Sequence, residues 1–348
     1  MAVLPSDPDI DQLRRQAKEL LRSGQRGEVS ALTRIGAVGE RLDLSTAQLA
    51  LAREYGFASW PKLKLEVKRR RILDERDLGE LSKLISQHPD LATSSMENWC
   101  DHPRGASPLG YIAMLRFDTG KNRWRDLSDT AEVARTLIAA GASVDGDHGD
   151  TETPLMTAAS YGDAAVARVL VEAGADLNAR ASEDAGGVPG GTALLHAAVF
   201  GMTDVVDVLV AAGAMIHGIE EAAAAGEISG WLQPDTPTDA RIRALVMAAD
   251  HQRLDVIDQL IAAGTPVDGV DPVFGGHPLR QAAGNGRPAS VRRLLGRGAD
   301  PNLIDPDHGL TPLGWCLRNR SGHAETSGFH EVESILRPLT RDGDVDET

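Results

Sequence analysis

Residues 153–178 read Thr-Pro-Leu-Met-Thr-Ala-Ala-Ser-Tyr-Gly-Asp-Ala-Ala-Val-Ala-Arg-Val-Leu-Val-Glu-Ala-Gly-Ala-Asp-Leu-Asn. Pro154 favours the first turn of a short helix, because its fixed backbone angle suits that position. Apolar residues between Ala164 and Val171 recur with a helical period and predict a second helix. Gly174 can adopt the left-handed conformation that ends a helix, and the Ala-Asp-Leu-Asn after it is typical of a turn. The stretch therefore predicts a pair of helices followed by a turn.

The same pattern recurs along the chain with constant spacing. A helix-opening leucine and the glycine that closes the next helix lie 19 residues apart in four units: Leu155 to Gly174, Leu194 to Gly213, Leu245 to Gly264 and Leu279 to Gly298. Leu109 and Leu313 open two further units with less regular spacing. Self-similarity of this kind is the signature of a repeat array, in which neighbouring units bury one continuous core. We therefore predict an all-α solenoid.

These units resemble the ankyrin repeat, whose hallmark is Thr-Pro-Leu-His-x-Ala-Ala, with a later Gly-Ala-Asp and a period of about 33 residues. The resemblance covers roughly residues 75–340. The chain departs from it at the hallmark histidine, where the residues are Gly110, Met156, Leu195, Val246, Arg280 and Gly314. The resemblance implies an ankyrin-repeat array with short β-hairpin fingers. It also implies that the first helix of each repeat, with the fingers, lines a concave groove for a protein partner.

Irregular segments give this array its own organisation. Insertions between the two helices of a repeat fall at 116–126 and 320–329, and one finger is lengthened at 183–191. Such insertions often lie on the binding face of a solenoid. The expected domains are an N-terminal helical extension (1–60), an N-terminal capping repeat (61–105), an array of about seven repeats with a compact one at 217–234 (106–340), and a disordered acidic tail (341–348).

Composition limits the compartment and the class of partner. The formal net charge is −15, although residues 1–75 hold 14 Lys and Arg against 11 Asp and Glu, so the acidic array should repel phosphate groups. Cys100 and Cys316 fit neither a disulfide framework nor a metal cluster, which suits a reducing cytosol. With no leader segment and no long apolar run, we expect a cytoplasmic protein without membrane contact. The 30 Arg against 6 Lys are typical of a GC-rich bacterial genome.

The groove face of each first helix is expected to start one position after the hallmark histidine and to include the residues three and four further on. This stripe is richer in aromatic residues than the chain as a whole, and aromatic side chains often anchor protein interfaces. We expect a protein partner to contact Tyr111, Tyr161, His196, Phe200, Met247, His251, Trp315 and Arg318. Phe117, Trp124 and Phe329, in or beside the insertion loops, would extend this surface. The alternative is that these rings fill gaps between helices.

A small-molecule site or an enzyme is a second interpretation, with His196, His251, Tyr161 and Glu221 as an acid–base set. The two histidines lie on repeats separated by another repeat, and adjacent helices are about 10 Å apart, so we expect no catalytic residues. The sequence has no Cys-x-x-Cys, no His-Glu-x-x-His and no phosphate-binding loop. We therefore expect neither a cofactor nor a metal ion.

A DNA-binding N-terminal segment is a third interpretation. Gln48, Ala52 and Gly56 have the spacing of a helix-turn-helix, and a basic stretch follows at Lys62, Lys64 and 68–71. The alternative is a helix that starts at Ser59 and ends in solvated basic residues. We favour the alternative, and expect a monomer that binds protein rather than nucleic acid.

Overall fold

The computed structural model describes residues 2–5, 7–96, 106–118, 120–273, 275–305 and 307–341. Within these ranges the chain forms 18 α-helices and one two-stranded sheet, which confirms the predicted mostly helical repeat fold. Cys100 and the predicted acidic tail, apart from residue 341, lie outside the described residues. None of the helices in these ranges is both long and apolar enough to cross a membrane.

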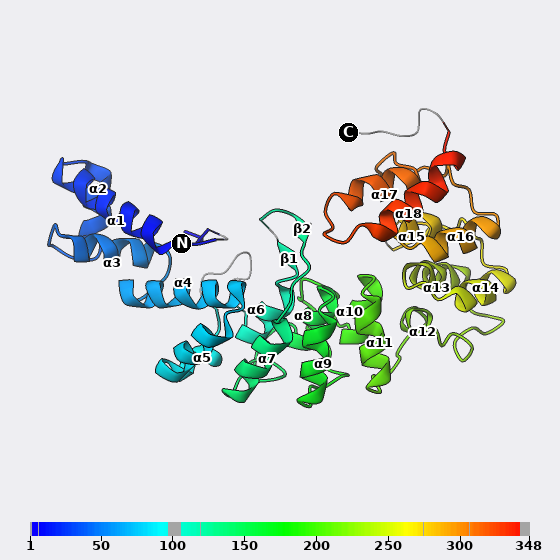
Figure 1. Cartoon of the computed structure of the whole chain (residues 1–348), viewed down its shortest axis with the longest axis horizontal. Coiled ribbons are helices and arrows are strands. Elements are labelled where there is room, and N and C mark those ends of the chain that lie inside the picture. The colour runs from blue at the N-terminus through cyan, green and yellow to red at the C-terminus, as the bar shows by residue number, and fades with distance from the viewer. Residues whose placement is uncertain are drawn as a thin grey trace. The chain divides into compact units, whose positions relative to one another are not determined.

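Two compact units divide the chain (Figure 1). Unit 1 comprises Met1–Ile112 and Asp129–Asp150. Its elements are α1 (Ile10–Gln25), α2 (Val29–Gly36), α3 (Leu44–Glu54), α4 (Trp60–Glu75), α5 (Leu78–Gln87), the 3-10 helix η1 (Pro89–Ala92), the start of α6 (Pro108–Met114), and α7 (Thr130–Ala139). Leu13 of α1 packs with Trp60, Leu63 and Val67 of α4 in one apolar cluster. The domain boundaries at residues 60 and 105 stay predictions.

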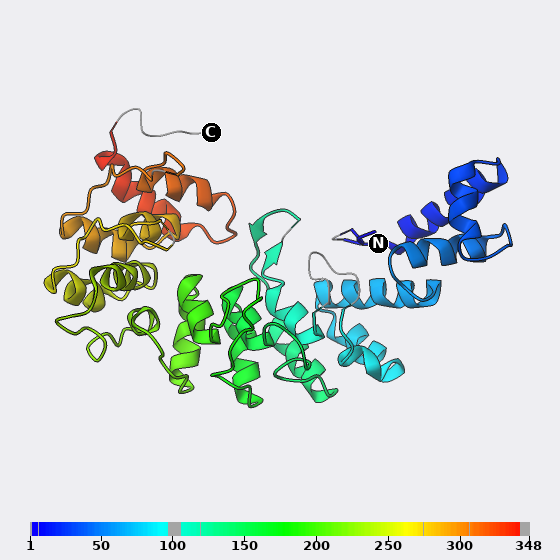
Figure 2. The same cartoon turned by 180° about the vertical axis from the view of Figure 1, so that it is seen from behind.

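Unit 2 comprises Ala113–Ser128 and Thr151–Thr348, and its helices form two rows (Figures 1 and 2). The inner row holds the first helix of each repeat: α8 (Pro154–Ser160), α10 (Ala193–Val199), α12 (Ile219–Ala225), α13 (Thr238–Asp250), α15 (Pro278–Gly284) and α17 (Pro312–Arg320). The outer row holds the second helices: α9 (Ala164–Glu172), α11 (Thr203–Ala211), α14 (Leu254–Ala262), α16 (Pro288–Gly296) and α18 (Ser327–Leu336), followed by the 3-10 helix η2 (Arg337–Leu339). Each inner helix packs on the next inner helix, and all but α12 pack on an outer helix of their own repeat.

The local signals that predicted these helices act as expected. Thr153 caps α8 by accepting a hydrogen bond from the backbone N–H of Met156 at 3.3 Å, and Pro154 occupies its first turn. Asp163 caps α9 in the same way, with the N–H of Val166 at 2.9 Å. All five glycines predicted to close a second helix have a positive φ: Gly141, Gly174, Gly213, Gly264 and Gly298.

Small aliphatic side chains form the core between the two rows, in keeping with the low aromatic content. The six leucines predicted to open a helix are fully buried: Leu109, Leu155, Leu194, Leu245, Leu279 and Leu313. The prediction was wrong for the place of Leu245, which lies in the middle of α13 because that helix begins at Thr238. Leu170, Leu209 and Leu260 of the outer row are also fully buried. Alanine pairs such as Ala158 and Ala159 allow adjacent inner helices to approach closely.

The fingers between repeats differ in detail from the paired strands that the resemblance implies. In the described ranges they are turns, and the one sheet is a hairpin in the first insertion, with β1 (Phe117–Asp118) antiparallel to β2 (Arg123–Trp124). Single backbone hydrogen bonds close the later fingers, from the N–H of Asp271 to the carbonyl of Gly276 at 2.8 Å and from that of Asp305 to Leu310 at 2.9 Å. Side chains also hold the turns, as where Asp176 accepts from the N–H of Asn178 at 2.9 Å.

Candidate functional site

One position of each repeat in unit 2 holds an aromatic or polar side chain that is important for the candidate site. It lies six residues after the helix-opening leucine, at or near the end of each full inner helix. We call the five residues at this position the column: Tyr161, Phe200, His251, Asn285 and Asn319. The first two are aromatic and the last three are polar, so the two halves of unit 2 present different surfaces.

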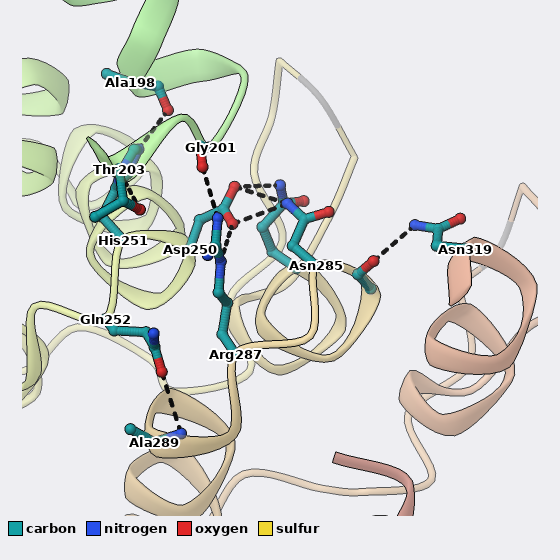
Figure 3. A network of polar contacts seen from close by, with 12 residues as sticks. Ala198, Gly201, Thr203, Asp250, His251, Gln252, Asn285, Arg287, Ala289 and Asn319 are labelled. Atoms are coloured by element: carbon teal, nitrogen blue, oxygen red, sulfur yellow. Dashed lines mark hydrogen bonds and ion pairs between the residues drawn. The ribbon is translucent and has the colours of Figure 1, made fainter. Parts of the chain in front are cut away.

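In the later repeats the column residues bind an earlier repeat (Figure 3). The Nε2 atom of His251 lies 2.8 Å from the carbonyl oxygen of Ala198, and its Nδ1 atom lies 3.1 Å from the hydroxyl of Thr203. Asn285 donates to Asp250 at 2.8 Å, and Asn319 donates to the carbonyl of Gly284 at 2.9 Å. Asn285 and Asn319 thus join adjacent repeats, whereas His251 joins two repeats that the compact repeat separates in sequence.

Asp250 is the centre of this polar network (Figure 3). Its carboxylate is 1% exposed and accepts hydrogen bonds from Gln281 and Asn285, both at 2.8 Å. The Nε atom of Arg287 lies 3.5 Å from the same carboxylate, while a terminal nitrogen of Arg287 donates to the carbonyl of Gly201 at 2.6 Å. The buried charge is thus neutralised by an arginine and satisfied by two amides, as a stable buried ion pair requires.

His196 is also buried and has two partners of its own. Its Nε2 atom lies 3.2 Å from the carbonyl oxygen of Val188, in the lengthened finger, and its Nδ1 atom lies 2.8 Å from the hydroxyl of Ser160. Because a carbonyl oxygen can only accept, Nε2 must carry the proton of the neutral ring, which leaves Nδ1 as an acceptor for the hydroxyl of Ser160, a group that also lies 3.0 Å from the carbonyl oxygen of Met156. The same argument assigns the same tautomer to His251, whose Nε2 faces Ala198.

Burial lowers the pKa of both His196 and His251, so both rings are neutral near pH 7. With both nitrogens of each ring in hydrogen bonds, neither ring offers a free lone pair to a substrate. Glu221, the carboxylate of the expected acid–base set, is also buried and accepts from the hydroxyl of Thr192 at 2.9 Å. The arrangement is one of structural hydrogen bonds. It brings no acid and base together.

In the early repeats the column reaches solvent. Phe200 is 40% exposed, and its ring lies 6.3 Å from that of His196. Tyr161, at the equivalent position of the preceding repeat, is half-buried, with its ring 6.4 Å from Phe117. These are the residues of the predicted stripe that remain available as aromatic contacts.

The two long insertions contact each other, which no local sequence pattern could predict. The backbone N–H of Trp124, at the end of β2, donates to the carbonyl of Gly322 at 2.7 Å. The ring of Trp124 stacks on His323 with a centroid distance of 6.1 Å, and Phe117 lies 5.0 Å from Trp124. We call this contact between the hairpin 117–124 and residues 322–323 the clasp.

Further rings extend the clasp into the last repeat. The ring of His323 lies 4.8 Å from that of Phe329, a buried residue of α18. Phe117, Trp124 and His323 are themselves half-buried. All three insertion-loop aromatics singled out from the sequence therefore take part in one cluster within unit 2.

Trp315 is already covered by cations of its own chain. The guanidinium carbons of Arg280 and Arg318 lie 4.3 and 5.1 Å from its ring centroid, and His308 packs edge-on at 4.8 Å. Trp315 is half-buried and Arg318 is exposed. Of the pair, Arg318 is the one that a partner could contact without rearrangement.

Several other predicted groove residues are interior. Tyr111, in unit 1, is 3% exposed, and its hydroxyl donates to Asp74 at 2.7 Å. Met247 is 3% exposed and packs within the inner row. Together with His196 and His251 they match the alternative in which such residues fill space between inner helices, and they are not included in the surface proposed below.

The basic stretch in unit 1 also differs from the solvated helix end expected from the sequence. Arg69 and Arg70 are each 2% exposed, because both pair with the buried carboxylate of Glu66. Arg69 also donates to the carbonyls of Leu91 and Ser94. Two of the four positive charges at 68–71 are therefore buried in ion pairs within the protein. This lowers the positive charge that the segment could present to DNA phosphates.

No metal site is evident in the described part of the chain, where no group of three or more His, Cys, Asp and Glu side chains is placed to hold an ion.

Part of the repeat array has a counterpart among known protein families. A family model described as ankyrin repeats, in three copies, matches residues 127–218. Among solved structures, the chain is similar to a human protein described as the ASB11 ankyrin repeat domain, with 22% identity and a TM-score of 0.33 over 67% of this chain and 97% of that one. No curated protein matches the chain. Ankyrin repeats are general modules of protein–protein interaction, and residues 127–218 of this chain match their family model.

Proposed function

We propose that unit 2 is a protein-interaction scaffold that holds a protein partner against the aromatic half of its column. The observation that carries the proposal is the 40% exposure of Phe200, at a position where later repeats use His251, Asn285 and Asn319 for internal hydrogen bonds. Exposed aromatic rings are the typical anchors of protein interfaces.

Neighbouring groups support the same surface. Tyr161 is half-buried one repeat earlier, and Phe117 and Trp124 of the hairpin are half-buried beside it. Rings in this state gain contact area on binding but lose little conformational freedom, because packing already holds them in place. We infer that the partner presents an apolar side chain to Phe200 and Tyr161.

The experiment is affinity capture from the native cytosol, followed by calorimetry with the partner that is recovered. Phe200→Ala is expected to weaken binding at least about tenfold, and addition of Tyr161→Ala to weaken it further. Met215→Ala is the matched control, because Met215 is 53% exposed and lies outside the column. Equal affinity of the Phe200→Ala and Met215→Ala proteins would remove the basis of the proposal.

A further inference from the structure

A groove in unit 1 has no role in the function proposed above. It has a volume of about 670 Å³ and lies between the start of α1 and one face of α4. Its apolar lining comes from Ile10, Leu65 and Val67, with Pro8 and Pro61 beside them. Ile10 and Leu65 are only half-buried, so apolar surface is left open to solvent here. A volume of this size is typical of sites that hold small molecules.

One side of the groove is basic. Lys64, Lys68 and Arg71 recur on α4 at helical spacing and therefore lie on one face, and all three line the groove with Lys62. Lys68 has a partial partner, since its amine lies 3.4 Å from Glu80 in an exposed pair. Lys62 and Lys64 have no ion-pair partner within the described residues. Their ammonium groups are available to an anion.

The other side is acidic, but two of its three carboxylates are already engaged. Asp9 caps α1 by accepting from the N–H of Gln12 at 2.5 Å, and Asp11 pairs with Arg14 at 2.6 Å. Asp7 is exposed. Three negative charges along this side would repel a ligand with many phosphates, because some of its charges would have to lie against them. The groove therefore suits a ligand with one anionic end and an uncharged apolar body.

We propose that this groove binds an amphiphile, a molecule whose apolar body covers Ile10, Leu65 and Val67 and whose single carboxylate lies against Lys62 and Lys64. Burial of the apolar body provides the affinity, at about 25 cal/mol per Å² of apolar surface removed from water. The lysines provide the orientation and the preference for an anion. The groove is built from residues of unit 1, whereas the column is built from residues of unit 2.

Calorimetry of the full chain tests the proposal with decanoate, kept below the concentration at which it forms micelles. Saturable binding of one decanoate per chain is the expected result. Decanol and decyltrimethylammonium have the same apolar body, and should bind at least about tenfold more weakly because they lack the anionic end. Absence of saturable decanoate binding, or equal binding of all three compounds, would overturn the proposal.

Variants locate the site. The double change Lys62→Glu with Lys64→Glu should weaken decanoate binding at least about tenfold, while Leu65→Asp should abolish it. Lys18→Glu is the matched control, because Lys18 is exposed on α1 and does not line the groove. Circular dichroism checks that each variant is folded. Decanoate binding that is unchanged in both groove variants would place the ligand elsewhere and contradict the assignment.

Discussion

The backbone N–H of Trp124 donates to the carbonyl of Gly322 at 2.7 Å, while the Trp124 ring stacks on His323. This clasp joins the hairpin that precedes the first full repeat of unit 2 to the loop within its last repeat. An open repeat array is stabilised only by contacts between neighbours. The clasp adds a contact between distant repeats, and so couples the two ends of unit 2 to each other.

The clasp predicts an energetic coupling between two residues far apart in the sequence. We expect a double-mutant cycle with Trp124→Ala and His323→Ala, measured by urea unfolding, to give an interaction energy of about 1 kcal/mol. Trp231→Ala provides the matched tryptophan control, since Trp231 is 37% exposed and is not one of the residues that form the clasp. Its cycle with His323→Ala should show no coupling. Additive effects of Trp124→Ala and His323→Ala would mean that the stacked rings contribute nothing to stability.

Removal of the Asp250 carboxylate should destabilise unit 2. Asp250→Ala leaves Arg287 without its counter-charge and Gln281 and Asn285 without their acceptor, which we expect to lower the free energy of unfolding by about 3 kcal/mol. Asp235→Ala, in an exposed turn, should change it by less than about 0.5 kcal/mol. Urea unfolding of both variants gives the comparison. Similar stabilities of the two variants would show that the network is not important for folding.

Much of the fold could be predicted because its signals are local. Thr153 and Pro154 at the start of a helix, a buried leucine at Leu155 and a positive-φ glycine at Gly174 each report on a few neighbouring residues. Ser59 caps α4 as expected, with the N–H of Lys62 at 3.4 Å. Because these signals recur along the chain, they predict a solenoid, in which helix pairs of similar length stack in the order of the sequence.

The arrangement of the candidate site depends on contacts that no local pattern encodes. Phe200 and His251 occupy the same repeat position, yet one is exposed and the other is buried against Ala198 and Thr203. His251 reaches α10 and the start of α11 across the compact repeat around α12, which has no second helix of its own. The clasp was missed for a similar reason, because its two insertions share no sequence signal.

Buried histidines predict that unit 2 loses stability in acid. Burial lowers the pKa of His196 and His251, and lowers that of His277 to about 4. In the unfolded chain these histidines become protonated near pH 6.5, whereas in the folded protein they become protonated only at lower pH. Their contribution is therefore fully present above about pH 6.5 and is lost as the pH falls from there towards the folded values, down to about 4 for His277. Within that range, each histidine adds up to about 1.4 kcal/mol per pH unit to the slope of the free energy of unfolding against pH.

The measurement is the free energy of unfolding in urea at several pH values between about 7.5 and 4.5, a range that brackets the unfolded histidine pKa. His251→Gln is expected to be less stable near neutrality but to show a shallower loss below about pH 6.5. His148→Gln, in an exposed turn, is the matched control and should keep the wild-type slope. A His251→Gln slope equal to that of the wild type would show that His251 does not resist protonation in the folded protein.

Arg69 predicts that the basic stretch of unit 1 has a structural role. Its guanidinium pairs with Glu66 at 2.6 Å and donates to the backbone carbonyls of Leu91, Ser94 and Ser95 at 3.0, 2.8 and 3.0 Å. Arg69→Met keeps an apolar stem of similar length but leaves a buried carboxylate and three carbonyls with fewer partners. We expect it to lower the free energy of unfolding by about 3 to 5 kcal/mol. Hydrogen exchange should then become faster at residues 89–96, the segment that Arg69 holds against α4.

The neighbouring Arg71→Met is the matched control for this change. Arg71 is exposed and lies 4.0 Å from Glu75 in a solvated pair, so its loss should cost less than about 0.5 kcal/mol. The two variants remove the same charge from the same helix and differ only in whether that charge is buried. If both lowered stability equally, the effect would come from the net charge of α4. A large effect confined to Arg69→Met would instead show that Arg69 joins α4 to the segment after α5. Arg69 donates hydrogen bonds to the backbone carbonyls of that segment, whereas Arg71 does not.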